Sequence, residues 1–382
     1  ESGKMVFPEL LIWLYTEQQQ YEAAFVQCKA VDRRFKLNGR RIYQFAELAK
    51  DIDMLDLSAR AYQAVIELGV DKPFTISAKY GLLEVRNKKL LLGNYTKTDL
   101  LELEAEYIEN IRDLGVNHLS ANFIKDLAHL QAFYLNKTDT AILLLKDLAY
   151  LSGVNSQVNA RAKLELGDIY LFKGEVWEAT LLYEQVDYDL KEEPLGQEAK
   201  YKNAQLCYFM GDFEWAKAQL DVLKSATSQL ISNNSIELLM IILDNTGLDT
   251  TEMPLQLYAK ADLFIYRNKP DSALTVLEKL ERLFPDNELT DDILFQKGKI
   301  ALLKGNYETA CMYLERVWKN YPDGILADNA LITCARIYEK QLNLKTKALD
   351  LYDNFIRNYP GSFFISEARS HYRLLRGDNL PQ

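Results

Sequence analysis

The stretch that decides the fold, residues 295–323, reads FQKGKIALLKGNYETACMYLERVWKNYPD. Apolar residues recur at three- and four-residue intervals in both of its halves, which indicates two amphipathic helices. Gly305 stands between the halves, where glycine can adopt the left-handed conformation that ends a helix. The small residues Gly298 and Ala310 allow the two helix axes to approach within about 8–10 Å. This stretch therefore predicts a tight pair of antiparallel helices.

The same pattern recurs along the chain about every 37 residues, which is the mark of a stacked repeat. Residues 164–186, LELGDIYLFKGEVWEATLLYEQV, are the clearest copy. Proline cannot continue a helical hydrogen-bond ladder, and it closes several of the second helices. Further copies align on His129, Ala204, Ala261 and Ala335, and the last of them needs one inserted residue in its turn.

The register is interrupted once, near residues 225–254, where about 20 additional residues include the apolar segment SIELLMIILDN. We expect an additional helix there. Strand signals, meaning alternating polarity with β-branched residues, are absent from the sequence. The expected organisation is therefore helical from end to end: N-terminal hairpins in residues 1–70, a long helical pair in 71–121, repeats in 122–230, an inserted helix in 231–253 and repeats in 254–382.

These residues resemble the tetratricopeptide repeat superfamily, most clearly from about residue 122 onward. The resemblance implies an all-α fold, a right-handed α-solenoid of antiparallel helix hairpins that forms a superhelix. The closing sequences NYPDG and NYPGS, the second followed by ISEAR, are similar to repeats of Gram-negative outer-membrane assembly lipoproteins and Tol-Pal coordinating proteins. Large relatives of this kind carry further repeats ahead of such a region, so Glu1 is expected to be an internal residue or a processing boundary.

That closer resemblance implies a non-catalytic scaffold in the periplasm or at the outer membrane, which binds a protein or peptide in its concave groove. A cytoplasmic regulator or co-chaperone adaptor is the alternative. A third reading is an enzyme whose catalytic part lies outside this chain. An upstream signal sequence or lipoprotein cysteine would separate the first two, and a fused domain would reveal the third.

Charge and hydropathy narrow the classes of partner. The 382 residues carry a net charge of −10, and such an averaged field repels phosphate backbones and anionic lipid head groups. Nucleic acid is therefore not the expected partner. The longest apolar runs, residues 10–15 and 238–243, are far shorter than the roughly 18 residues that a membrane-spanning helix needs.

Few residues of the sequence suggest a catalytic, cofactor-binding or metal-binding site. The four cysteines show no CxxC pairing and are expected to be buried thiols. The three histidines form no HExxH motif, and no phosphate-binding or nucleophile motif occurs. No catalytic, cofactor or metal residues are therefore expected. The acidic pairs Glu192-Glu193 and Asp291-Asp292 are interpreted as solvated carboxylates near helix starts. The basic residues 31–41 are interpreted as a solvated linker rather than an anion site.

One set of residues suggests binding. In the tetratricopeptide family, certain first-helix positions face the concave groove, and here they are rich in aromatic side chains, which offer large rigid contact area. Half of these aromatics are expected to fill the core instead. The resemblance implies a partner-binding groove formed by Phe133, Tyr134, Arg161, Asp168, Phe172, Tyr201, Gln205, Tyr208, Phe209, Tyr258, Asp262, Tyr266, Phe295, Lys299 and Arg336.

Overall fold

The computed structural model describes residues 2–92, 95–149, 151, 155–226, 228–246, 251–285 and 287–378. Within these ranges the regular structure is entirely helical and contains no strand, which confirms the all-α, solenoid-type fold class. The chain divides into two compact units, Glu1–Lys173 and Gly174–Gln382, called here the N-terminal and C-terminal units. This division falls inside the expected repeat segment 122–230.

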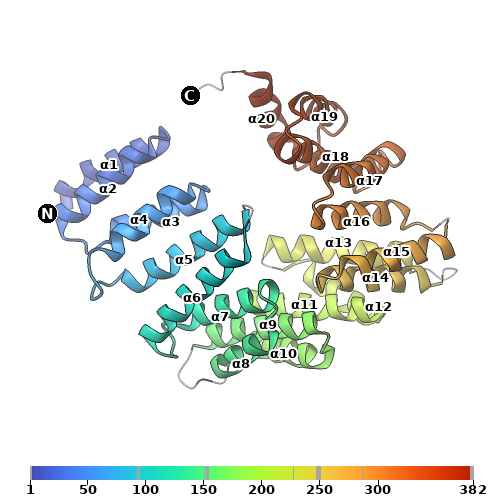
Figure 1. Cartoon of the computed structure of the whole chain (residues 1–382), viewed down its shortest axis with the longest axis horizontal. Coiled ribbons are helices and arrows are strands. Elements are labelled where there is room, and N and C mark those ends of the chain that lie inside the picture. Colours follow the sequence, from blue (N-terminus) through green and yellow to red (C-terminus); the bar gives the residue numbers. More distant parts are fainter. Residues whose placement is uncertain are drawn as a thin grey trace. The chain divides into compact units, whose positions relative to one another are not determined.

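In the N-terminal unit, helices that follow one another in the chain pack side by side as antiparallel pairs (Figure 1). The helix bounds in this unit are α1 (Ser2–Glu17), α2 (Tyr21–Phe35), α3 (Arg40–Asp51), α4 (Leu55–Ile66), α5 (Thr75–Leu92), α6 (Lys97–Leu114), α7 (Ala121–His129), α8 (Thr138–Ala149) and α9 (Ser156–Lys173).

The C-terminal unit contains the most regular repeats and also the additional helix, α13, which packs against α11, α12 and α14. Elsewhere in the unit, first and second helices alternate (Figure 1). The bounds are α10 (Val176–Asp189), α11 (Pro194–Met210), α12 (Phe213–Leu223), α13 (Gln229–Asn245), α14 (Met253–Tyr266), α15 (Pro270–Leu283), α16 (Thr290–Leu303), α17 (Tyr307–Asn320), α18 (Ala327–Arg336), α19 (Lys345–Asn358) and α20 (Ile365–Arg376).

Residues 295–323 form the closely packed helices α16 and α17, and two glycines explain why. Gly305 has a φ of +71° and ends α16, in the left-handed region that glycine enters without steric cost. A Cβ on Gly298 would lie 3.0 Å from the side chain of Leu314 on α17, so the two helices do approach closely at this point. Asn306 occupies the N-cap position of α17, but its side chain accepts no hydrogen bond from the start of that helix.

A wider, π-helical turn explains the inserted residue of the last repeat. Helix α18 continues into η2 (Ile337–Gln341), where the N–H of Leu342 donates to the carbonyl of Ile337, five residues earlier, at 3.0 Å. A π turn absorbs one more residue than an α turn of the same length. Ala335 and Ala348, both fully buried, therefore keep their packing positions although they are one residue further apart in sequence than Gly298 and Ala310.

The second π-helical turn, η1 (Leu130–Tyr134), corrects the alignment of an earlier repeat. His129 was aligned with the small, buried position, but its side chain is 43% exposed and contacts Glu165 at 2.8 Å. Ala128 is fully buried instead and has the same sequence separation from the buried Ala141 as Ala335 has from Ala348. The groove positions that were assigned from His129 are therefore displaced by one residue.

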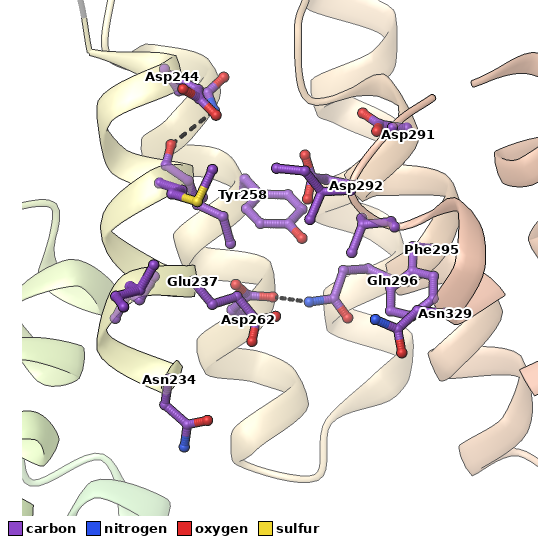
Figure 2. Close-up of a pocket in the computed structure, with 18 of the residues that line it drawn as sticks. Asn234, Glu237, Asp244, Tyr258, Asp262, Asp291, Asp292, Phe295, Gln296 and Asn329 are labelled. Carbon is purple, nitrogen blue, oxygen red and sulfur yellow. Dashed lines mark hydrogen bonds between the residues drawn. The ribbon is translucent and has the colours of Figure 1, made fainter. Parts of the chain in front are cut away.

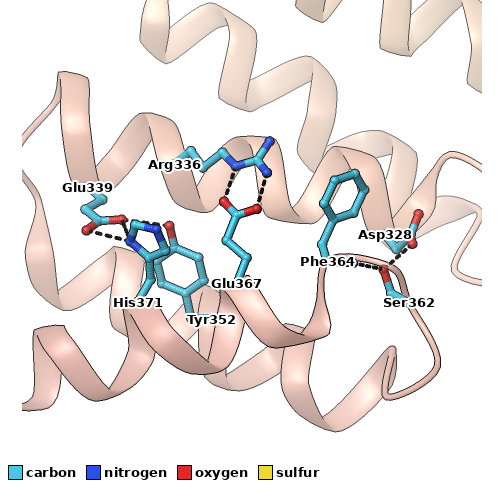
Figure 3. A network of polar contacts seen from close by, with 8 residues as sticks. All are labelled: Asp328, Arg336, Glu339, Tyr352, Ser362, Phe364, Glu367 and His371. Carbon is cyan, nitrogen blue, oxygen red and sulfur yellow. Dashed lines mark hydrogen bonds and ion pairs between the residues drawn. The ribbon is translucent and has the colours of Figure 1, made fainter. Parts of the chain in front are cut away.

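Side-chain contacts attach the final helix to the last repeat (Figure 3). Arg336 on α18 donates from Nε and Nη2 to the carboxylate of Glu367 on α20, at 2.7 and 2.5 Å. Glu339 contacts the ring of His371, also on α20, and accepts a hydrogen bond from Tyr352 at 2.7 Å. Because these contacts link three elements, α20 is fixed to the repeat by paired charges as well as by apolar packing.

Two further interpretations from the sequence, of the basic stretch and of the cysteines, have different outcomes. The basic stretch 31–41 is not a linker as expected, because most of it belongs to the end of α2 and the start of α3. Asp32 is buried within it and accepts hydrogen bonds from the N–H groups of Gly39 and Arg41, at 2.7 and 2.9 Å. The cysteines, in contrast, are free thiols as expected; three are buried and Cys207 is half-buried.

Candidate functional site

The candidate site is a pocket of about 910 Å³ in the C-terminal unit (Figure 2). Its lining side chains come from the first helices α11, α14, α16 and α18, from the additional helix α13, and from the connections that precede α16 and α18. Among the described residues, none on the second helix of a repeat lines it. The pocket thus opens on the first-helix side of the repeats, where the tetratricopeptide resemblance placed a binding surface.

The pocket is strongly acidic. Among its described lining residues Lys299 is the only basic side chain. At the rim, the ammonium group of Lys299 lies 4.8 Å from the centre of the Phe295 ring. The carboxylates come from four different elements, so their negative potentials add within one enclosed space. They are Glu237, Asp244, Asp262, Glu288, Asp291 and Asp292.

Asp262 on α14 is held in place by two hydrogen bonds. The hydroxyl of Tyr208 donates to its Oδ2 at 2.9 Å, and Nε2 of Gln296 donates to its Oδ1 at 2.7 Å. Burial raises the pKa of Asp262 to about 7, although the Tyr208 hydrogen bond and the charge of Lys299 act in the opposite direction. Near neutral pH this carboxyl group is therefore balanced between its charged and neutral forms.

Asp292, in the first turn of α16, has a pKa that is raised to a similar value. Burial raises its pKa to about 7, and the negative charges of Asp291 and Asp262 add to the effect. Asp291-Asp292 was interpreted from the sequence as a solvated pair at a helix start. The pair does stand at the start of α16, as interpreted. The interpretation is wrong for the solvation of Asp292, because this side chain is half-buried in the pocket.

Two further polar groups lie beside the carboxylates. Tyr258 is only 3% exposed, and Figure 2 shows its hydroxyl directed between Asp292 and Gln296; a hydrogen bond with Gln296 acts on the pKa of this hydroxyl. The amide nitrogen of Gln296 also donates to Asp262, and Oε1 of Gln296 is buried without a donor. Buried polar groups are normally paired, so a ligand that donates to this Oε1 would complete the pairing.

The structure distributes the predicted groove residues over both units. Phe133, Tyr134, Arg161, Asp168 and Phe172 belong to the N-terminal unit, where the rings of Phe133 and Phe172 lie 4.9 Å apart and Arg161 is exposed. In the C-terminal unit, five of the predicted residues line the pocket: Tyr201, Tyr258, Asp262, Phe295 and Lys299.

The remaining predicted residues lie elsewhere in the C-terminal unit. Tyr208 and Phe209 are buried in the core. Tyr266 contacts the ring of Phe209, with 6.0 Å between ring centres, and Gln205 is half-buried. Arg336 is held by its ion pair with Glu367 and lies over the ring of Phe364 (Figure 3). Core packing thus uses some of the aromatics, as the sequence analysis expected.

Several pocket residues escaped the sequence analysis. Glu237 and Asp244 lie on α13, which interrupts the repeat register and has no family position to compare with. Asp292 and Gln296 lie on α16, where the register is regular. Asp292 stands six residues before Gly298, a spacing that the resemblance itself assigns to the groove. That spacing was the signal that could have identified it.

Across the described ranges, no group of three or more His, Cys, Asp or Glu side chains is arranged to hold a metal ion. No helix in the part of the chain that the structure describes is long and apolar enough to cross a bilayer.

A match to a family model supports the repeat assignment for two segments of the chain. Residues 292–324 and 335–362 match the family model described as tetratricopeptide repeat. Similar solved structures include a tetratricopeptide repeat protein from Parabacteroides merdae (14% identity, 77% of this chain and 97% of that chain, TM-score 0.39). Another is the TPR domain of P58(IPK), with 17% identity, 99% of this chain and 100% of that chain covered, and a TM-score of 0.28. A third is PilW, a type IV pilus biogenesis factor, with 12% identity, 77% and 98% of the two chains covered, and a TM-score of 0.32. No curated protein matches the sequence.

Together, the helical hairpins and the family match support assignment to the tetratricopeptide repeat superfamily. The matched segments cover most of α16 and all of α17, and then the stretch from the end of α18 through α19. Proteins built from this repeat are typically non-catalytic scaffolds, and the fold suggests a scaffold for protein–protein interaction with a protein partner.

Proposed function

We propose that the chain is a non-catalytic interaction scaffold of the bacterial cell envelope, periplasmic or associated with the outer membrane. Its C-terminal unit would bind a segment of a partner protein on the first-helix side. The observation that carries this proposal is the pocket of about 910 Å³ enclosed by α13 and four first helices, a size typical of sites that bury a ligand of several side chains.

The rim of the pocket supports a peptide as the ligand. Ile236, Met240 and Ile325 line it and are exposed, Ile325 to 66%. Exposed apolar side chains around a polar interior are the composition expected where a chain segment docks and excludes water. The aromatic-proline closures of the repeats, similar to those of envelope proteins, support the compartment. A cytoplasmic regulator or co-chaperone adaptor is the alternative.

In-cell photo-crosslinking tests this proposal. A photo-reactive amino acid in place of Ile325, at the pocket rim, should capture one partner segment that mass spectrometry identifies as an envelope protein. The same amino acid in place of Met312, which is exposed on the second helix α17, is the matched control and should not capture that segment. Equal capture at both positions would contradict a pocket-bound partner, and a cytoplasmic partner would support the alternative.

A further inference from the structure

We infer that the pocket binds an arginine side chain of the partner segment, with the guanidinium group between Asp262, Asp292 and the hydroxyl of Tyr258. This inference rests on the proposed function, since it names the side chain that the bound segment would insert. Three features of the pocket lead to it: its charge, its hydrogen-bond acceptors and its aromatic walls.

The negative charge of the pocket indicates that its ligand is a cation. Six carboxylates face the pocket, and the only basic side chain among its described lining residues is Lys299, which lies at the rim over Phe295. Carboxylates gathered from four elements repel one another, and a cation between them removes that cost. Asp262 and Asp292 stand on neighbouring first helices, so a single bound group can contact both.

The acceptors of the pocket indicate a ligand with several donors. Oε1 of Gln296 is buried without a donor, and the carboxylates of Asp262 and Asp292 lie near it in the pocket (Figure 2). A guanidinium group presents five N–H donors in one plane and no acceptor, whereas an ammonium group presents three. A site that offers several acceptors therefore matches arginine better than lysine.

The aromatic walls favour the same side chain. Tyr201, Tyr258 and Phe295 line the pocket together with carboxylates. A guanidinium group stacks on aromatic faces and is more weakly hydrated than an ammonium group, so it loses less on entering such a site. Leu238 and Ile241 also line the pocket, and we expect them to contact the aliphatic part of the arginine or an apolar neighbour in the segment.

Peptide binding to the full chain tests the inference. The probe is acetyl-Ala-Leu-Arg-Leu-Ala-amide, and the controls are the same peptide with lysine or with citrulline, the neutral isostere of arginine. Calorimetry should give an affinity at least tenfold higher for the arginine peptide than for the citrulline peptide, with lysine between them. Equal affinity of the arginine and citrulline peptides would overturn the inference.

Two variants locate the bound group. Asp292→Asn and Asp262→Asn should each weaken binding of the arginine peptide at least tenfold. Glu308→Gln removes the same charge from an exposed position on α17 and should change binding less than twofold. If Glu308→Gln weakens binding as much as the pocket variants, only the net charge matters and the inference fails. Binding of Ca²⁺ or Mg²⁺ at millimolar concentration that competes with the peptide and is lost in the pocket variants would assign the site to a metal ion instead.

The pH dependence gives a further readout. Asp262 and Asp292 have pKa values raised to about 7, and a cation binds their ionised forms. Affinity for the arginine peptide should therefore rise between pH 6 and pH 8, and the rise should shrink in both variants. An affinity that does not change over this range would contradict binding at these carboxylates. The charged or titratable groups around the two carboxyls are Tyr208, Asp244, Tyr258, Asp291 and Lys299.

The crosslinking experiment separates this inference from the proposed function. If the segment captured at Ile325 contains no arginine, the inference is wrong while the scaffold function stands. If no segment is captured there, the proposed function fails as well. Capture of a segment in which arginine is the basic residue, with loss of capture in Asp292→Asn, would support both.

Discussion

Asp262 and Asp292 are residues whose environment opposes their usual charge. Their pKa values lie near 7 because burial disfavours the carboxylate form. Groups of this kind reduce stability at the pH where they ionise, and they tend to occur at functional sites. Tyr208 shows the supporting role of a residue behind the site, because its 1% exposed side chain fixes Asp262 through a hydrogen bond without lining the pocket.

The stability of Asp292→Asn should depend on pH in a defined direction. The folded-state pKa of Asp292 is raised, so the folded protein binds more protons than the unfolded chain between about pH 4 and pH 7, and wild-type stability falls as pH rises through that window. The carboxamide does not titrate. Urea unfolding should therefore show the variant to be more stable by about 1–3 kcal/mol at pH 8, with the difference vanishing near pH 4. Equal stability at pH 8 would contradict a buried carboxylate.

Gly298 tests close helix packing at a single residue. A Cβ there would lie 3.0 Å from two carbons of the Leu314 side chain, so Gly298→Val should overpack α16 against α17 and lower the free energy of unfolding by about 1–3 kcal/mol. Gly361→Ala is the control, because its added Cβ would meet no atom within 4 Å. Chemical denaturation of both variants measures the difference, and equal effects would disprove tight packing at Gly298.

At the scale of the element, the helices differ in the contacts that attach them to their neighbours. Most are held by apolar pairs, but α20 is also tied by charge, through the bidentate contact of Arg336 with Glu367 and the contact of Glu339 with His371. The hydrogen bonds from Arg336 are the main cause that lowers the pKa of Glu367. This contribution to stability is present above the usual pKa of the carboxyl group and is lost as pH falls through the lowered value.

A double-mutant cycle measures this attachment. Arg336→Ala and Glu367→Ala, alone and together, should give a coupling energy of about 1 kcal/mol at pH 7, because the pair is bidentate but still a third exposed. The control cycle uses Arg357 and Asp353, a pair one turn apart on α19 whose arginine is 74% exposed, and about 0.3 kcal/mol is expected for it. Similar coupling in the two cycles would indicate that the geometry of the α20 contact adds nothing.

The sequence predicted elements better than it predicted the site. Helix starts and turns follow from local chemistry, as the positive φ of Gly305 illustrates. The pocket depends on residues from five helices whose relative positions no local pattern encodes. Both Tyr258 and Tyr208 were assigned to the groove from the sequence, yet Tyr258 lines the pocket and Tyr208 lies behind it. This difference depends on the helices that surround each tyrosine in the fold.

At the scale of the whole molecule, each unit has its own core and contains its own repeats. Every residue that lines the pocket belongs to the C-terminal unit. In repeat proteins, each repeat is stabilised mainly by its immediate neighbours, so a contiguous group of repeats carries most of its own stability. The pocket is therefore expected to need only the second unit.

A fragment of residues 174–382 tests that expectation. It should retain a helical circular dichroism spectrum and bind the arginine peptide within about threefold of the affinity of the full chain, because no pocket residue is removed. The complementary fragment, residues 1–173, is the control and should not bind. A folded 174–382 fragment that does not bind would contradict the location of the site.

The additional helix α13 has a consequence for how a partner is positioned. An array of near-identical hairpins offers the same contacts repeatedly, so a bound strand or helix can shift by one period at little cost. Helix α13 occurs at one place and forms a wall of the pocket there. It removes the translational equivalence of neighbouring repeats and gives an incoming ligand a single preferred register.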